Sequence, residues 1–385
     1  MAVDVAVIGA GIAGTAVAAF LADGGMRVRL YERSAIAAAA SGRNSGIVQH
    51  PFDPLLVGLY RATLDAYAWL AEREPTFDLG DDPAGLLYVG HDREAAGRVA
   101  FEWQAAWPAT TPQVLEGADL RRLEPALAPD LVACRLAVGY PIAPAAATDA
   151  FAAVARRAGV DIVISGAVTP AADGATVVGV VTDGRVEQAG AVIVATGPWA
   201  PETIDPGGGW RPIRSSWGVV VSVALDDAPR HGLEAIDIAI EPAEPAGPAD
   251  DDAPPESGAR SSVVEFSLVP AFRSSALGST FLDREPDPTA WLQALRATGS
   301  RFVPAIATAP VEGMRHCARP VSRDGRPLVG RASWLDGLWI VAGHGPWGIS
   351  TGPGSAGLVA DAILGRTRAD AIPPELRPDR FGTPL

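Results

Sequence analysis

The chain opens with a short apolar run that is followed at once by a longer segment with apolar residues at helical spacing. Val3–Gly9 reads VDVAVIG and predicts a buried strand, and Ile12–Asp23 predicts a helix. Arg27–Tyr31 predicts a second strand, which ends in Glu32. A strand, a glycine turn, a helix and a strand ending in an acid are the parts of a dinucleotide-binding βαβ unit.

The glycine turn has the spacing that a dinucleotide needs. It consists of Gly9, Ala10, Gly11, Ile12, Ala13 and Gly14. Gly9 permits a tight turn, Gly11 lets a pyrophosphate approach the backbone, and Gly14 lets the helix pack on the sheet. The free N–H groups at the start of the helix supply an anion site. Glu32 can accept hydrogen bonds from an adenosine ribose, whereas Arg33 beside it keeps a 2′-phosphate, and thus NADP, open.

Two later segments bear on which dinucleotide binds. Ala189–Gly197 predicts a buried strand that closes on a Thr-Gly turn, and Leu338–Ala342 predicts another strand, followed by the turn Gly343–Gly348 and a helix over Ser350–Leu364. A second strand-turn-helix far from the first favours a long cofactor that is contacted at both ends, as FAD would be. A helix N-terminus near a flavin ring would stabilise the negative charge that develops on reduction. A nicotinamide-dependent dehydrogenase, which needs no second turn, stays open as an alternative.

Composition narrows the class of protein. The 385 residues suggest roughly two to three domains, and 48% hydrophobic with 20% charged residues is typical of a folded protein. All 31 basic residues are arginine, so chemistry that needs a lysine amine is excluded.

The net charge of −14 opposes binding to nucleic acid. Cys134 and Cys317 are too few for a disulfide scaffold or a structural zinc site, and no metal is expected. The N-terminus lacks a basic signal region and no stretch reaches membrane-spanning length, so we expect a cytoplasmic protein without a membrane partner.

Four motifs together resemble the D-amino-acid oxidase family of FAD-dependent flavoproteins, especially its glycine oxidase, sarcosine oxidase and D-amino-acid dehydrogenase branches. They are GAGIAG at Gly9–Gly14 with Glu32, ASGRNSGI at Ala40–Ile47, ATGPWA at Ala195–Ala200, and CARPVSRDGRPLVG at Cys317–Gly330 running into AGHGPWGISTGP. The first motif is common among flavoproteins, whereas the last is fairly specific. The resemblance spans nearly the whole chain.

The resemblance implies an α/β fold with a Rossmann-like FAD-binding domain and a discontinuous substrate domain built on a mainly antiparallel sheet. The FAD-binding segments would be 1–48, 139–205 and 317–385, and the substrate segments would be 49–138 and 206–316.

One segment of the substrate domain, 241–260, is rich in proline and acid and predicts a flexible loop, either a lid or a solvated hairpin extension.

The resemblance also implies the cofactor contacts. They are Gly9, Gly11, Ile12, Ala13, Gly14, Glu32, Arg33, Ala40, Ser41, Arg43, Asn44, Ser45, Gly46, Ile47, Val168, Thr196, Gly197, Trp199, Gly343, His344, Gly345, Pro346, Trp347, Gly348, Ile349, Ser350 and Thr351. Val168 would end a strand over Asp161–Val168 beside the adenine. Cys317 aligns with the cysteine that carries flavin covalently in sarcosine-oxidase-like members, but most members of the wider group lack such a bond, and a buried, inert thiol is the favoured interpretation.

The same resemblance places the substrate. Arg319 matches the arginine that clamps the substrate carboxylate, and a planar guanidinium suits bidentate recognition of that group. Phe266 and Ser267 stand where glycine oxidase relatives have a tyrosine, and Pro346 and Trp347 stand where some relatives have a second arginine. We therefore expect a changed pocket and a bulkier or N-substituted amino acid, with Trp347 and His50 as candidate pocket residues.

The implied reaction is oxidation of the C–N bond of glycine, an N-substituted glycine or a D-amino acid by hydride transfer to flavin N5. The imine would hydrolyse to a 2-oxo acid, glyoxylate for glycine types, plus ammonia or an amine, and O2 would be reduced to H2O2. Sarcosine-oxidase relatives use a lysine over the flavin to activate oxygen, and this chain has none. An amine dehydrogenase with another electron acceptor therefore stays open. A second open alternative is a protein that keeps flavin as a structural element. The oligomeric state is not predicted.

Overall fold

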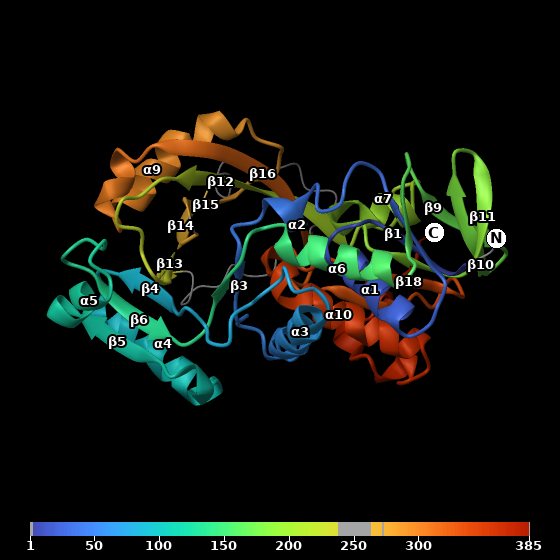
Figure 1. The fold of residues 1–385 in the computed structure, drawn as a ribbon, viewed down its shortest axis with the longest axis horizontal. Helices are drawn as coiled ribbons and strands as arrows, with labels where there is room; N and C mark the ends of the chain where they lie inside the picture. Colours follow the sequence, from blue (N-terminus) through green and yellow to red (C-terminus); the bar gives the residue numbers. More distant parts are fainter. Residues whose placement is uncertain (1–2, 238–262, 272, 385) are drawn as a thin grey trace.

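The computed structural model describes residues 3–237, 263–271 and 273–384, and the predicted loop 241–260 lies outside them. Two large sheets lie side by side, one toward each end of the molecule (Figure 1). The first is a mixed sheet with a parallel centre and the second is mainly antiparallel. The predicted α/β fold class is therefore confirmed.

The first sheet has a parallel core in the order β18-β11-β1-β2-β8, with β17 antiparallel at one edge and a hairpin of β9 and β10 extending from β11. Its strands are β1 (Val3–Ile8), β2 (Val28–Glu32), β8 (Asp161–Ile164), β9 (Thr169–Asp173), β10 (Thr176–Thr182), β11 (Arg185–Val194), β17 (Leu328–Arg331) and β18 (Leu338–Ala342). Val5 and Val7 of β1 enter the core on one face, and Ala6 and Ile8 enter the core on the other. Burial on both faces explains why this strand is an unbroken apolar run.

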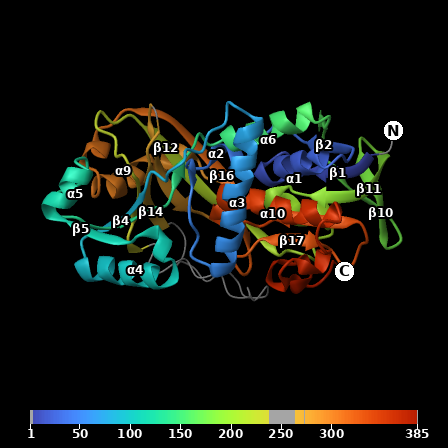
Figure 2. The same cartoon turned by 60° about the horizontal axis from the view of Figure 1, so that its bottom comes forward.

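Helices cover one face of this sheet. They are α1 (Ile12–Asp23), α3 (Pro54–Arg73), α6 (Ala146–Arg157) and α10 (Gly348–Ile363). Helix α3 lies across α10 in the middle of the molecule (Figure 2). It belongs to segment 49–138 of the chain, yet its buried side chains share the core of the first sheet. On the other face lie the β9–β10 hairpin and α7 (Ala200–Ile204).

The second sheet has the order β16-β12-β15-β14-β13-β4-β6-β5, and its pairs are antiparallel except β13 with β4. Its strands are β4 (Leu86–Gly90), β5 (Gln113–Glu116), β6 (Val132–Leu136), β12 (Ile213–Val223), β13 (Gly232–Ala235), β14 (Val263–Val269), β15 (Ser275–Phe281) and β16 (Val311–Ser322). The helices of this half are α4 (Arg93–Ala106), α5 (Gly117–Leu123) and α9 (Leu292–Ser300). Alternate residues of β14 divide between its faces, with Phe266 and Leu268 in the core beneath α9.

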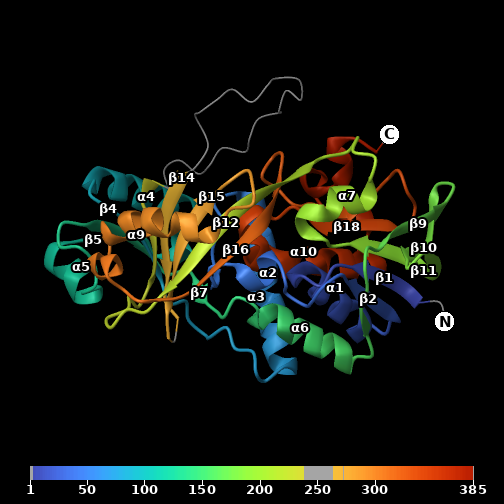
Figure 3. The same cartoon turned by 90° about the horizontal axis from the view of Figure 1, so that it is seen from above.

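Strands β12 and β16 connect the two halves. They pair over eleven residues of β12 and extend from the second sheet toward the first (Figure 3). Near the end of β16, Val321 forms a β-bridge with His344, which follows β18 of the first sheet. A two-stranded sheet of β3 (Ile47–Val48) and β7 (Tyr140–Pro141), preceded by the short helix α2 (Ala40–Arg43), lies in the same region.

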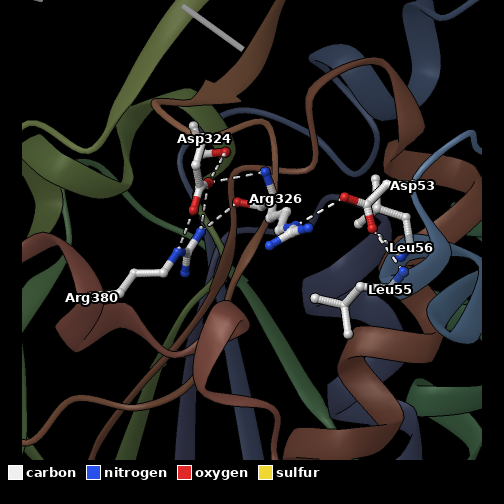
Figure 4. Close-up of polar contacts among 7 residues, drawn as sticks. Asp53, Leu55, Leu56, Asp324, Arg326 and Arg380 are labelled. Atoms are coloured by element: carbon white, nitrogen blue, oxygen red, sulfur yellow. Dashed lines mark hydrogen bonds and ion pairs between the residues drawn. The ribbon is translucent and has the colours of Figure 1, made fainter. Parts of the chain in front are cut away.

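A polar network ties the C-terminal segment to the start of α3 (Figure 4). Asp53 caps α3 by accepting hydrogen bonds from the Leu55 and Leu56 N–H groups, and its other oxygen accepts from Arg326 Nε at 2.9 Å. Arg380 donates to both oxygens of Asp324 at 2.7 and 3.0 Å. It also donates to the Arg326 carbonyl at 2.7 Å, so the turn after β16 is held from both sides.

Candidate active site

A cavity of about 950 Å³ lies between the two sheets and is lined by residues that follow the parallel strands β1, β2, β8, β11 and β18. The carboxyl ends of parallel strands are where open α/β sheets bind ligands. The opposite wall of the cavity is formed by the second sheet. The cavity therefore brings the predicted dinucleotide turn and the predicted carboxylate clamp together.

The glycine turn has the geometry that the sequence predicts. Strand β1 ends at Ile8, α1 begins at Ile12, and Gly9 has a φ of 103°. A Cβ on Gly14 would collide with the Gly9 carbonyl, so α1 can pack this closely only because Gly14 has no side chain. Ser41 Oγ accepts a hydrogen bond from Ile12 N–H at 2.9 Å, which fixes α2 against the turn.

Glu32 and Arg33 both line the cavity beside this turn. One carboxylate oxygen of Glu32 accepts from Ala10 N–H at 2.9 Å, and the other accepts from Ser34 N–H at 2.9 Å. The Arg33 guanidinium stacks on Trp199, 3.9 Å from the ring centroid. The acid is thus held at the end of β2, where an adenosine ribose would be bound.

The loop that contains α2 is fixed by its own polar groups. Asn44 Nδ2 donates to the Ser41 and Pro144 carbonyls, and Asn44 Oδ1 accepts from Gly46 N–H at 2.8 Å. Arg315 donates from Nε and Nη2 to the Asn44 carbonyl at 3.1 and 3.0 Å. These contacts hold the loop against β16 along one side of the cavity.

The turn after β18 forms the opposite end of the first-sheet wall. It contains the 3-10 turn η5 (Gly345–Trp347), which leads directly into α10. His344 is buried, and burial lowers its pKa to about 4, so its ring is neutral at physiological pH. The ring nitrogen Nε2 lies 3.0 Å from Ser355 Oγ. The start of α10 therefore faces the cavity with backbone groups and no cationic side chain.

Arg319 projects from β16 into the second-sheet wall. Its Nη1 donates to the Thr280 carbonyl at 2.7 Å and its Nη2 donates to Ser279 Oγ at 3.0 Å. The guanidinium also stacks on Phe281, 4.4 Å from the ring centroid. To reach β15 it crosses β12 at Gly218, where any Cβ would collide with it. Burial lowers the pKa of Arg319 from its usual value, but a guanidinium keeps its charge.

Most of the predicted site residues line the cavity. They are Gly9, Gly11, Ile12, Ala13, Glu32, Arg33, Ala40, Ser41, Arg43, Asn44, Ser45, Ile47, Val168, Thr196, Gly197, Trp199, Cys317, Arg319, His344, Gly345, Pro346, Trp347, Gly348, Ile349 and Ser350. Cys317 is buried with its Sγ 4.0 Å from the Arg43 carbonyl. Burial raises the pKa of this thiol, against a smaller opposite effect of three nearby arginines, so it is protonated at neutral pH.

Five predicted residues do not line the cavity, namely Gly14, Gly46, Gly343, Thr351 and His50. The His50 ring is buried among aromatic side chains, with its centroid 5.1 Å from Tyr60, 5.1 Å from Trp103 and 5.0 Å from Trp107. Burial lowers its pKa, and its Nδ1 lies 2.7 Å from the Pro51 carbonyl. The structure therefore places His50 in an aromatic cluster beside the cavity rather than in its wall.

Sequence reasoning missed several residues of the cavity wall. They are Gln49 and Phe52, which lie between β3 and α3, and Glu234, Glu265, Ser279 and Phe281 of the second sheet. Of the pair at the predicted anchor position, Ser267 lines the cavity, whereas Phe266 is in the core and stacks on Phe302 with ring centroids 4.4 Å apart. The alternation of Glu265 and Ser267 with Phe266 and Leu268 is a signal for a strand with one polar face, but it does not show that this face lines a cavity.

None of the helices within the described part of the chain is long and apolar enough to cross a bilayer. In the same residues, no group of three or more His, Cys, Asp or Glu side chains is arranged to hold a metal ion.

The fold and this cavity define a dinucleotide-binding α/β protein with a second, mainly antiparallel sheet over the cavity. The family model of the FAD dependent oxidoreductases matches residues 4–362, and the chain belongs to that family. The predicted resemblance and the predicted cofactor FAD are thereby confirmed, and the chain is an FAD-dependent oxidoreductase.

Several relatives are similar over nearly the full length. Glycine oxidase of Pseudomonas aeruginosa is 27% identical over 389 residues, covering 95% of this chain and 96% of that protein. The crystal structure of glycine oxidase from Bacillus cereus matches with a TM-score of 0.78 at 23% identity, covering 96% of this chain and 97% of that one. Iminodiacetate oxidase from Chelativorans sp. matches with a TM-score of 0.75 at 24% identity, over 98% of each chain. The two structural matches establish the shared fold.

Proposed function

We propose that this protein oxidises the C–N bond of an amino acid or secondary amine that bears a carboxylate, with glycine, N-substituted glycines and D-amino acids as the substrate class. The observation that carries the proposal is the position of Arg319. Its guanidinium lies in the wall of the same cavity that the dinucleotide turn lines, held by Thr280, Ser279 and Phe281. A fixed planar guanidinium is suited to bidentate recognition of a carboxylate.

The residues around the cavity fit FAD. Gly197, Gly345 and Gly348 line it, and no atom of the described residues lies within 4 Å of the position where a Cβ on any of them would stand. The backbone there is open to a ligand. Residues 1–48, 139–205 and 317–385 would hold the cofactor, with Glu32 at the adenosine ribose, Val168 at the adenine and the start of α1 at the pyrophosphate. The turn Gly343–Gly348 and the 40–47 loop would contact the ring.

When bound, FAD supplies the two-electron acceptor for the reaction. Arg319 would bind the substrate carboxylate and so orient the Cα–H bond, which is a positioning role. Trp347 and Phe52 contact each other with ring centroids 5.7 Å apart and would exclude water from one side of the substrate. Oxidation gives an imine, which water hydrolyses to a 2-oxo acid and ammonia or an amine. O2 would take up the two electrons and two protons as H2O2.

The test is the visible spectrum of the purified holoprotein under anaerobic conditions, before and after addition of glycine, sarcosine, longer N-alkyl glycines and D-amino acids. We expect at least one of them to bleach the flavin band, and a yellow protein that no amine bleaches would overturn the proposal.

The electron acceptor is measured separately. Readmitting O2 should restore the flavin band and release H2O2. Recovery only with an artificial dye would make the protein a dehydrogenase, which the absence of lysine from the sequence also permits.

A further inference from the structure

Two carboxylates in the cavity wall have no role in the proposed reaction. Glu234 lies on β13 and Glu265 lies on β14, and both line the cavity. Glu234 pairs with Ser267 across the β13–β14 ladder, and Glu265 stands two residues before Ser267. The β14–β15 register shifts between Val264 and Ser267, but Glu234, Glu265 and Ser267 all line the cavity, so both carboxylates lie on its side of the sheet.

Both glutamates are half-buried in the cavity wall. Gln49 Nε2 donates to Glu234 at 2.8 Å, whereas no described residue donates a hydrogen bond to the Glu265 side chain. Tyr88 pairs with Glu234 across the neighbouring ladder, and its buried hydroxyl has no hydrogen-bond partner among the described residues. Burial raises the pKa of Glu234 to about 7, with a further rise from the Glu265 charge that the Gln49 hydrogen bond opposes. Burial also raises the Glu265 pKa, partly offset by Arg319.

The charges on the second-sheet wall do not balance. Among the cavity-lining residues on the described strands of that sheet, Arg319 contributes the one arginine charge, whereas Glu234, Glu265 and a substrate carboxylate contribute three negative charges when ionised; Arg43 lines the cavity from α2. The reacting amine must be neutral to be oxidised, so it does not restore the balance. Buried charges are costly unless they are paired, and a further cation in the cavity would pair them.

The arrangement of the strands separates the two kinds of charge. Because Arg319 lies against Gly218 of β12 and reaches Thr280 and Ser279 of β15, its guanidinium lies between these two strands, and β14 and β13 follow in the sheet. Adjacent strands are about 4.8 Å apart, so the strands that carry Glu265 and Glu234 lie roughly 7 and 12 Å along the wall from the guanidinium. That separation exceeds the single carbon between an α-carboxylate and its amine, and it suits a group at the far end of a substrate side chain.

We propose that the substrate carries a second, cationic group, an ammonium or guanidinium, which Glu234 and Glu265 bind while Arg319 binds the carboxylate. The substrate is then a dibasic amino acid, or a glycine whose N-substituent ends in a cation. This inference rests on the proposed function for the reacting centre. Gln49 acts as a positioning residue that holds the Glu234 carboxylate toward the cavity.

The test compares matched pairs that differ only in charge. The holoenzyme is given D-arginine or D-citrulline, and N-(3-aminopropyl)glycine or N-butylglycine, and kcat/KM is measured from flavin reduction. In a separate titration, 5-guanidinovalerate and 5-ureidovalerate, which have a carboxylate and no α-amine, are bound to the oxidised enzyme and followed by the change in the flavin spectrum. We expect the cationic member of each pair to be favoured by roughly 10- to 100-fold, the range that a hydrogen bond to a charged group gives.

Variants test whether Glu234 and Glu265 cause the preference for the cationic member of each pair. Glu234→Gln and Glu265→Gln should each lower the preference about tenfold, and the double variant should abolish it. Glu312→Gln is the matched control, because Glu312 is an exposed carboxylate on β16 outside the cavity, and it should leave the preference unchanged. FAD content is measured for each variant. If a variant fails to fold, the wild-type titration with the valerate pair still decides.

The outcomes separate the two proposals. If no amine reduces the flavin but guanidinovalerate binds more tightly than ureidovalerate, the proposed oxidation is overturned and the cation site stands. If the amines reduce the flavin but the neutral members are used and bound equally well, the cation site is overturned. A preference that persists in the double variant also overturns it, as does one seen with the amines but not with the valerates.

Discussion

The Arg319 guanidinium crosses β12 directly over Gly218, and this crossing sets the position of the proposed carboxylate clamp. Strand β12 lies between β16 and β15 in the sheet, so the Arg319 side chain must pass over it to reach Ser279 and Thr280. Stacking on Phe281 then fixes the plane of the guanidinium. A missing Cβ on one strand thus positions a charged group that belongs to another.

Gly218→Ala should therefore weaken substrate binding without removing the arginine. The added methyl group would displace the guanidinium from its present position. We expect KM for a carboxylate substrate to rise roughly 10- to 100-fold, which corresponds to loss of a charge-assisted hydrogen-bonded pair, with FAD content unchanged. Gly313→Ala on β16 is the control, because no atom of the described residues lies within 4 Å of its Cβ position. Equal KM values for the two variants would contradict this account.

The pH dependence of the preference for a cationic substrate follows from Glu234. Burial raises its pKa to about 7, and Gln49, Glu265 and the Tyr88 hydroxyl are the polar groups nearest to it. Below that pH Glu234 holds a proton and is neutral, and above it the carboxylate is charged. The ratio of kcat/KM for D-arginine to that for D-citrulline should therefore rise by about tenfold between pH 6 and pH 8. Because both substrates carry the same reacting amine, the ionisation of that amine cancels in the ratio. In Glu234→Gln the ratio should no longer change with pH.

At the scale of elements, the approach of α1 to β1 depends on Gly14. In Gly14→Ala the new Cβ would collide with the Gly9 carbonyl and push the helix away from the anion site. We expect a loss of about 1–3 kcal/mol in the free energy of unfolding together with weaker FAD binding. The matched control is Gly97→Ala, an exposed glycine within α4 with open space around its Cβ position, which should stabilise the protein by up to about 1 kcal/mol. Thermal unfolding with and without added FAD measures both effects, and a neutral Gly14→Ala would contradict the packing argument.

The elements that the sequence predicts well are those buried on both faces. Strand β18 has the predicted bounds Leu338–Ala342, and β1 ends one residue before the predicted Gly9, because continuous burial leaves a continuous apolar run. The second-sheet wall could not be predicted in the same way. Glu234 reaches the cavity because β13 pairs with β4, a strand about 145 positions earlier in the chain, and local periodicity contains no information on such a pairing.

At the scale of the molecule, contacts between residues that are distant in sequence join the two sheets. Val321 of β16 bridges to His344 after β18, which connects the strand of Arg319 to the turn Gly343–Gly348. The turn that follows β16 is held by Asp324 and Arg326 (Figure 4). The relative position of the two walls of the cavity therefore depends on this turn and on the C-terminal segment that contacts it.

Arg380→Gln tests that dependence. Burial would raise the Asp324 pKa, but hydrogen bonds and charge from Arg380, with smaller effects of Arg326 and Ser322, lower it below 3.8. A carboxyl whose pKa is lower in the folded state stabilises the fold fully above its unfolded pKa, and loses that contribution as the pH falls through the folded value.

The Asp324 side chain is 38% exposed, so solvent screening limits the expected loss in Arg380→Gln to about 1 kcal/mol at pH 7. The difference from wild type should stay constant above about pH 5 and shrink below pH 4, as urea unfolding of the FAD-saturated proteins would measure. Arg331→Gln is the matched control. Its partner Asp336 lies five residues away in an exposed pair, so its removal should cost less than about 0.5 kcal/mol. A larger KM in Arg380→Gln than in Arg331→Gln would show that the turn also sets the position of Arg319. Equal free energies of unfolding for the two variants would mean that the C-terminal segment does not hold the two sheets together.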